Sequence, residues 1–183
     1  MKSSKTYKMA VAASMAALSL ILDVISVRSN ISKFTIYGLP LLLAGFLFGP
    51  WVGALAGAVV GFISQMLFYG LSYTTALWMI APIFWGFLSG LMSKYLIKDN
   101  FNLKKVILIT FTTSLCVTAI NSCALYLDSL IFDYPLSLTV GTIALRFAFS
   151  LAFACVYCLV IYISYPRLYK IIKKPPESPL SPQ

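Results

Sequence analysis

Two ionisable side chains lie within long apolar stretches of this sequence, Asp23 and Arg146. A charge is costly to bury in hydrocarbon, so buried ionisable residues are candidates for function. Because an arginine keeps its proton, Arg146 needs a carboxylate, carbonyl oxygens or an anionic ligand as a partner. Asp23 or Asp128 would serve as a structural partner. The carboxylate of a bound ligand would serve equally well.

Polar and aromatic residues gather toward one end of the apolar stretches between residues 51 and 165. Tyrosine and tryptophan at such ends usually anchor a helix at a membrane interface, and an amide such as Gln65 can be a structural bond between helices. The combination with an acid and an arginine exceeds what anchoring requires and suits a pocket for a flat, hydrogen-bonding ligand. The candidate substrate-binding residues are therefore Arg146, Gln65, Trp78, Tyr69, Tyr73, Asn121, Tyr126 and Asp128.

The sequence lacks the residues that several kinds of catalytic and metal sites require. The sequence contains no histidine, only five acidic residues and no GxxxxGK[ST] stretch, which leaves no catalytic triad, P-loop or zinc site. Cys155 and Cys158 form a CxxC that could indicate metal or redox chemistry. Their apolar neighbours favour small hydrophobic side chains packed in a helix. We therefore predict no enzyme, no cofactor and no metal.

The composition is that of a membrane protein. Of the 183 residues, 60% are hydrophobic and 10% are charged, whereas soluble domains have about 45–50% apolar and about 25% charged residues. The net charge of +9 arises from short clusters between apolar stretches. This placement fits cytoplasmic loops and attraction to anionic lipid rather than nucleic-acid binding.

We predict an all-α integral membrane protein built as a bundle of six transmembrane helices. Their expected ranges are 7–27, 34–48, 51–69, 74–96, 104–127 and 138–165. The basic start of the chain resembles a signal peptide, but the apolar run behind it is long enough to span and is taken as the first helix. Residues 1–174 form a single membrane domain, and the Pro- and Ser-rich residues 175–183 are a disordered cytoplasmic tail.

The basic residues set the expected orientation. With the N-terminus inside, eleven of the fourteen basic residues are cytoplasmic, as the positive-inside rule requires. Both termini are then cytoplasmic. Gly49 and Pro50 predict a tight cytoplasmic turn between the second and third helices.

Small residues spaced by four predict close helix packing on two helices. Gly53, Gly57 and Gly61 are expected to pack against a neighbouring helix within the protein. The alanines of the first helix have two open roles, internal packing or docking onto another membrane subunit. They are Ala12, Ala13, Ala16 and Ala17.

These features together resemble a known family, the substrate-binding membrane subunits (S components) of energy-coupling-factor (ECF) vitamin importers. The similarity covers nearly the whole chain and is nearest to the folate-type members. It rests on Lys8-Met9-Ala10, Ala12-x-x-x-Ala16-x-Leu18, Leu39-Pro40-Leu41-Leu42-Leu43-Ala44-Gly45, Leu47-Phe48-Gly49-Pro50, Gly53 and Gly57.

The resemblance implies a function. An S component binds a vitamin with high affinity and docks, through small residues of its first helix, onto a transmembrane coupling subunit with two partner ATPases. Ala12, Ala13, Ala16 and Ala17 would form the docking face, and residues 28–33 an outer gate. The expected location is the plasma membrane of a prokaryote. Arg146 suits an anionic vitamin such as folate or pantothenate.

Two other classes of function remain open at this point. An independent secondary transporter would move its substrate without ATP, although no internal repeat is visible. A structural or assembly subunit would bind no small molecule, and the polar and aromatic cluster argues against it.

Overall fold

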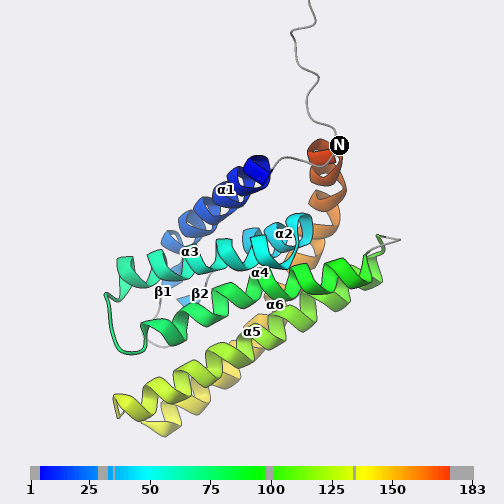
Figure 1. The fold of residues 1–183 in the computed structure, drawn as a ribbon. Helices are drawn as coiled ribbons and strands as arrows, with labels where there is room; N and C mark the ends of the chain where they lie inside the picture. Colours follow the sequence, from blue (N-terminus) through cyan, green and yellow to red (C-terminus); the bar gives the residue numbers. More distant parts are fainter. Residues whose placement is uncertain (1–4, 29–32, 35, 98–100, 134, 174–183) are drawn as a thin grey trace, which may run out of the picture.

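The computed structural model describes residues 5–28, 33–34, 36–97, 101–133 and 135–173. The predicted tail, residues 175–183, lies outside this range. The described part is all-helical apart from one short hairpin (Figure 1). Its elements are α1 Lys5–Val24, β1 Val27–Arg28, β2 Lys33–Phe34, α2 Gly38–Phe48, α3 Pro50–Phe68, α4 Thr75–Leu96, α5 Leu103–Ile131 and α6 Leu136–Lys173.

Within the described ranges, five helices are long and apolar enough to cross a membrane: α1, α3, α4, α5 and α6. The sixth, α2, has 11 residues and rises about 16 Å, at about 1.5 Å per residue. A hydrocarbon core is about 30 Å thick. The six-helix architecture is confirmed, but α2 is too short to span the membrane by itself.

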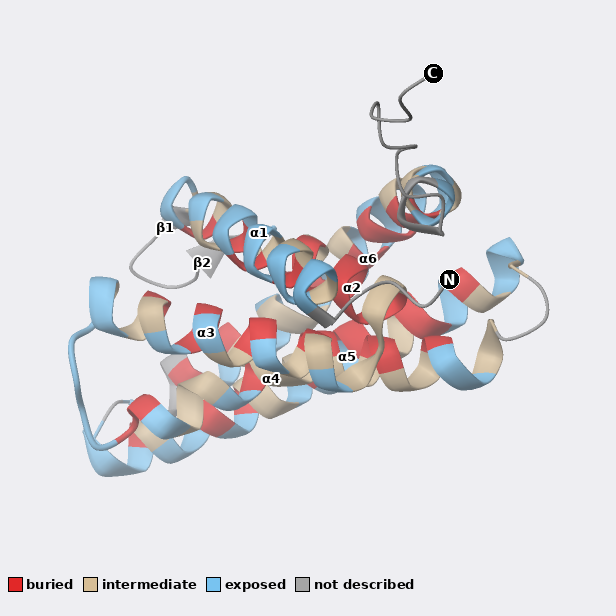
Figure 2. Cartoon of the chain, turned by 45° about the horizontal axis from the view of Figure 1, so that its top comes forward, coloured by how far each residue is buried: buried red, intermediate tan, exposed pale blue. Residues whose placement is uncertain are grey.

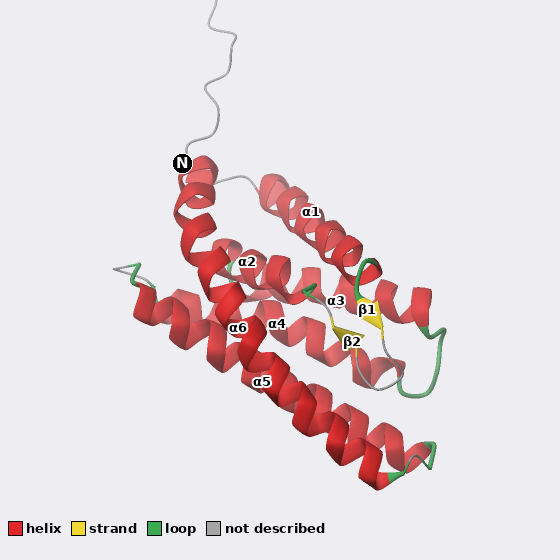
Figure 3. Ribbon diagram, turned by 180° about the vertical axis from the view of Figure 1, so that it is seen from behind, coloured by secondary structure: helices red, strands yellow, loops and turns green. Residues whose placement is uncertain are grey.

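The segment between α1 and α2 corrects two predicted boundaries. The first helix ends at Val24 and not at residue 27, and the second begins at Gly38 and not at residue 34. Val27 pairs with Phe34, and Arg28 with Lys33, in an antiparallel hairpin at the end of α1 (Figure 3). Strands of two residues are too short to show the alternating pattern that identifies a strand in a sequence.

The turn between α2 and α3 is as tight as predicted. Gly49 is at once the C-cap of α2 and the N-cap of α3, with φ of +91°, a region that favours glycine. Its N–H donates to the carbonyl of Gly45 at 2.9 Å. Pro50 then begins α3, where its missing N–H costs no helical hydrogen bond.

The glycine face of α3 packs internally, against α4. A Cβ atom added at Gly57 would collide with the carbonyl oxygen of Pro82, and one added at Gly53 would collide with the backbone of Gly86. The two helices therefore approach each other at backbone distance. This contact confirms the predicted packing role of the glycines.

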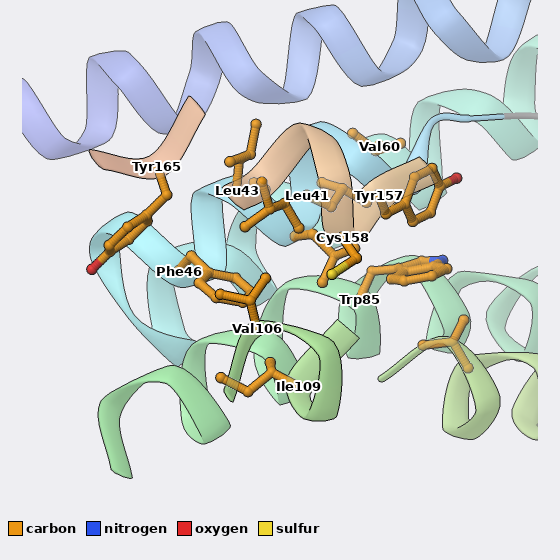
Figure 4. Close-up of a cluster of buried hydrophobic side chains, with 14 of the residues drawn as sticks. Leu41, Leu43, Phe46, Val60, Trp85, Val106, Ile109, Tyr157, Cys158 and Tyr165 are labelled. Atoms are coloured by element: carbon orange, nitrogen blue, oxygen red, sulfur yellow. The ribbon is translucent and has the colours of Figure 1, made fainter. Parts of the chain in front are cut away.

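The interior is apolar, and so are the outward faces of the helices. Leu41, Phe46, Trp85 and Tyr157 belong to one buried cluster to which all six helices contribute (Figure 4). Exposed positions are distributed along the outer faces of the bundle (Figure 2), and they include Leu67, Val156 and Leu159. Such apolar surfaces suit a lipid environment.

The ends of the helices fall into two groups in space. The start of α1, the end of α6, the end of α4 and the start of α5 lie toward the top and right of Figure 1. Strands β1 and β2, the end of α3, the start of α4, the end of α5 and the start of α6 lie toward its left. Among the described residues, basic side chains such as Lys94, Lys104 and Lys170 belong to helix ends of the first group, as the charge rule expects of one side of the membrane.

Candidate functional site

A cavity of about 210 Å³ lies among α3, α4, α5 and α6, with Tyr37, just before α2, contributing to its wall. Its lining combines one cation, two amides, four hydroxyl groups of serine or threonine, and aromatic rings. The lining residues are Tyr37, Val60, Gly61, Ser64, Gln65, Tyr69, Trp78, Pro82, Trp85, Ser114, Val117, Thr118, Asn121, Arg146, Phe149, Ser150, Phe153 and Tyr157.

Arg146 brings the positive charge of α6 into this cavity. Its Nη1 donates to the backbone carbonyl of Asn121 at 3.5 Å, and its guanidinium lies 5.7 Å from the centre of the Trp78 ring. In the described part of the chain, no carboxylate forms an ion pair with it. Most of its hydrogen-bonding capacity is therefore available to a ligand.

The two acids that were considered as structural partners of Arg146 have other surroundings. Asp23 is 1% exposed, and its Oδ2 accepts a hydrogen bond from the hydroxyl of Ser64. Asp128 lies outside the cavity lining, and its buried Oδ1 accepts no hydrogen bond from the described residues. Neither acid neutralises Arg146 directly.

Aromatic side chains form the wall nearest the protein core. The rings of Trp85 and Tyr157 meet edge to face, with centroids 5.7 Å apart and planes at 71° (Figure 4). The ring of Phe153 lies 6.3 Å from that of Tyr157. Tyr37 and Asn121 line the same cavity as Trp85. These contacts hold the rings in place, as a preformed site for a flat ligand requires.

A pair of hydroxyl groups joins α5 and α6 at the cavity. The Oγ atoms of Ser114 and Ser150 are 3.0 Å apart, and Ser114 also lies 3.2 Å from the carbonyl oxygen of Ser150. Both serines are buried. The bond links the two helices one turn along α6 from Arg146 and satisfies polar groups that would otherwise be costly to bury.

The structure brings together most of the residues expected to bind substrate. Arg146, Gln65, Trp78, Tyr69 and Asn121 all line the cavity. Three others do not: Tyr73 is fully exposed, Tyr126 is 45% exposed on α5, and Asp128 is the acid described above. Tyr73 lies in the α3–α4 connection, and Tyr126 and Asp128 lie in the last two turns of α5. At such positions a sequence does not distinguish a residue at the membrane interface from a site residue.

Several cavity residues were not identified from the sequence. Tyr37 falls within the range expected for the second helix, although in the structure it immediately precedes α2, and Trp85 and Tyr157 lie deep within apolar helices. Serines such as Ser64 and Ser150 give little signal, because a serine in an apolar helix often bonds only its own backbone. The glycine spacing of α3 does point to Ser64, since it follows Gly57 and Gly61 by seven and three residues on one helical face.

The four alanines of α1 divide between two faces. Ala12 and Ala16 are 5% and 4% exposed and pack within the protein. Ala13 and Ala17 are exposed, as are Ala10 and Ser14. Within the isolated chain, the surface that α1 offers to a partner is thus formed by the second pair.

No metal-binding group of three or more suitable side chains occurs among the described residues. Cys158 is buried, and Cys155 is exposed on the outer surface of α6. All four cysteines are free thiols. The CxxC lies outside the cavity lining.

The chain belongs to the family of substrate-specific components of ECF transporters. The model of that family, "ECF transporter, substrate-specific component", matches residues 7–173. Members of this family are substrate-binding subunits of transporters and integral membrane proteins, not enzymes in themselves. No curated protein matches the chain in sequence.

Solved structures share the fold. FolT bound with folic acid superimposes with a TM-score of 0.69 at 18% identity, over 90% of this chain and 97% of that one. The S component of a bacterial ECF transporter superimposes with a TM-score of 0.66 at 19% identity, over 93% of this chain and 100% of that one.

Proposed function

We propose that this protein is the high-affinity vitamin-binding subunit of an ECF-type ABC importer, and that its substrate is an anionic water-soluble vitamin such as folate. The observation that carries the proposal is Arg146, a cation without a carboxylate partner in the described chain, set in an aromatic cavity. An anionic group would supply the missing partner. The aromatic walls would hold a flat ring.

The resemblance to FolT supports this choice of substrate. That protein was solved with folic acid, which carries both a flat ring system and carboxylates. The shared fold gives this chain a cavity in a comparable architecture, and Arg146 with Trp78 supplies matching chemistry. Pantothenate is the alternative within the family, because it is also anionic but has no ring.

The proposed partners follow from the family. A transmembrane coupling subunit and two ATPase subunits would supply ATP hydrolysis, which this sequence has no motif to perform. The exposed small side chains of α1, Ala13 and Ala17, would permit close approach of a partner helix. The proposed location is the plasma membrane of a prokaryote, with both termini in the cytoplasm.

A thermal-shift screen of the detergent-purified chain against water-soluble vitamins tests the proposal. A ligand that binds only the folded state raises its stability by an amount that grows with ligand concentration relative to Kd. We expect a concentration-dependent increase in Tm with folate. An increase with pantothenate alone would change the substrate and keep the function. No increase with any vitamin would contradict the binding function.

A further inference from the structure

The hydrogen bond between Ser64 and Asp23 joins the cavity wall to a buried charge. Ser64 lines the cavity from α3, and its hydroxyl donates to the carboxylate of Asp23 on α1. Asp23 is 1% exposed and is not part of the lining. The carboxylate therefore cannot contact a ligand in the cavity, but it can determine what Ser64 offers to one.

A serine hydroxyl has one proton and two lone pairs. In this structure the proton of Ser64 is directed to Asp23, which leaves the oxygen to act toward the cavity as an acceptor. Hydrogen bonds to a carboxylate are stronger than neutral ones. The bond also polarises the hydroxyl and makes its oxygen a better acceptor.

The cavity thus has two chemically opposite polar groups on different helices. Ser64 on α3 is an acceptor, and Arg146 on α6 is a cation and donor. Among the described residues, α3 packs mainly against α4, and α6 against α5. The two groups therefore belong to separate helix pairs, and aromatic rings such as that of Trp85 on α4 line the same cavity.

From this arrangement we infer that Ser64 is a specificity-determining residue that accepts a hydrogen bond from an exocyclic amino group on the ring of the substrate, and that Asp23 is the residue that positions it. The substrate class is a flat heterocycle with an exocyclic amino group as donor, carrying an anionic group for Arg146. This inference rests on the proposed function and narrows it. Compounds with an acid but no such ring fall outside the class.

A comparison of two ligands tests the inference in the wild-type protein. The probes are folic acid and its analogue with a methyl group in place of the 2-amino group of the ring. We expect Kd to be about tenfold or more higher for the analogue, because the acceptor is left without its donor. Equal affinity for the two ligands would contradict the inference while leaving vitamin binding intact.

The variants Ser64→Ala and Asp23→Asn complete the test. The preference ratio is the Kd of the 2-methyl analogue divided by the Kd of folic acid. We expect this ratio to fall close to one in Ser64→Ala and to an intermediate value in Asp23→Asn. The ratio separates this role from a structural one, since general destabilisation weakens the binding of both ligands alike. A wild-type ratio retained in Ser64→Ala would overturn the inference. If that variant does not fold, the wild-type comparison decides.

Matched controls come from outside the cavity. Ser14 is an exposed serine of α1 that bonds its own backbone, and Asp133 is an exposed acid, so Ser14→Ala and Asp133→Asn should keep the wild-type ratio. The screen of vitamins separates the two proposals. Binding of pantothenate alone would overturn the inference and keep the proposed function, and absence of any vitamin binding would overturn both.

Discussion

At the scale of single residues, the arginine in the cavity is the most informative feature. Arg146 is held from two sides, by the carbonyl of Asn121 and by the face of Trp78. A cation–π contact leaves the edge of the guanidinium free to form hydrogen bonds. A planar, bidentate carboxylate is the natural partner for that edge.

Replacing this arginine gives the first residue-level prediction. In Arg146→Ala, Kd for the vitamin should rise about 10- to 100-fold, which corresponds to the roughly 1.5–3 kcal/mol of a hydrogen bond to a charged group. The Kd of Arg146→Lys should lie between those of the wild type and Arg146→Ala, because lysine keeps the charge but loses the planar guanidinium that can form two parallel hydrogen bonds. Isothermal titration of the purified variants measures the effect.

The control for this prediction is on the same helix. Arg167 is exposed near the end of α6 and lies outside the cavity lining. Arg167→Ala should bind as the wild type does. Unchanged vitamin affinity in Arg146→Ala would contradict the proposal that an anionic group of the substrate binds this arginine.

The sequence identified the cavity by its unusual residues and missed its ordinary ones. Arg146, Trp78 and Asn121 are conspicuous because charged, indole and amide groups are costly or rare within apolar helices. Ser64 and Tyr157 are common helix residues, and only the packing of α3, α4 and α6 brings them to the same cavity. That packing depends on contacts between helices distant in the chain, which no local pattern encodes.

At the scale of elements, the contact between α3 and α4 defines one side of the site. Because Gly57 lies against the carbonyl of Pro82, α3 lies close enough for Ser64 and Trp85 to reach the same cavity. The sequence predicted this face from three glycines spaced by four. It did not indicate which helix would be the neighbour.

Gly57→Ala tests this element contact. The added methyl group would force the helices apart, and overpacking of this kind costs about 1–3 kcal/mol. We expect a clear decrease in Tm of the unliganded protein, together with weaker vitamin binding. Thermal unfolding in detergent, with and without ligand, measures both effects.

Gly141→Ala is the matched control. Gly141 lies within α6 with open space around the position of a Cβ atom. Alanine is the better helix former by about 1 kcal/mol, so this variant should have an equal or higher Tm. A similar loss of stability in both variants would argue against the backbone contact as the cause.

At the scale of the whole molecule, the bundle separates an inward and an outward face of α1. Ala16 belongs to the buried core, whereas Ala13 and Ala17 are at the surface. Sequence spacing placed all four alanines on one docking face. The spacing alone could not tell which pair faces inward. Both pairs are spaced by four residues, and adjacent residues in a helix are only about 100° apart around its axis.

This division changes what bulky substitutions should do. Ala13→Trp and Ala17→Trp should leave vitamin binding intact and abolish ATP-driven uptake in proteoliposomes that contain the coupling complex, because bulk prevents close docking. Ala12→Trp and Ala16→Trp should lower the Tm of the isolated chain, since neither position has room for an indole.

The control for docking is Leu159→Trp, an exposed position on α6, which should transport normally. Normal uptake by both Ala13→Trp and Ala17→Trp would mean that another surface contacts the coupling subunit. Loss of vitamin binding in these two variants would instead point to a role of α1 in shaping the cavity.

The short length of α2 has a consequence for the distance that a vitamin must travel. From the turn at Gly49, this helix rises about 16 Å, and Tyr37 at its far end lines the cavity. In the proposed orientation, with that turn at the cytoplasmic surface and α2 along the membrane normal, Tyr37 would lie near the middle of a hydrocarbon core about 30 Å thick. A vitamin bound against it, as proposed, would have completed about half of its crossing before any ATP is consumed. Only the remaining half-thickness would then have to be opened by movement of the protein.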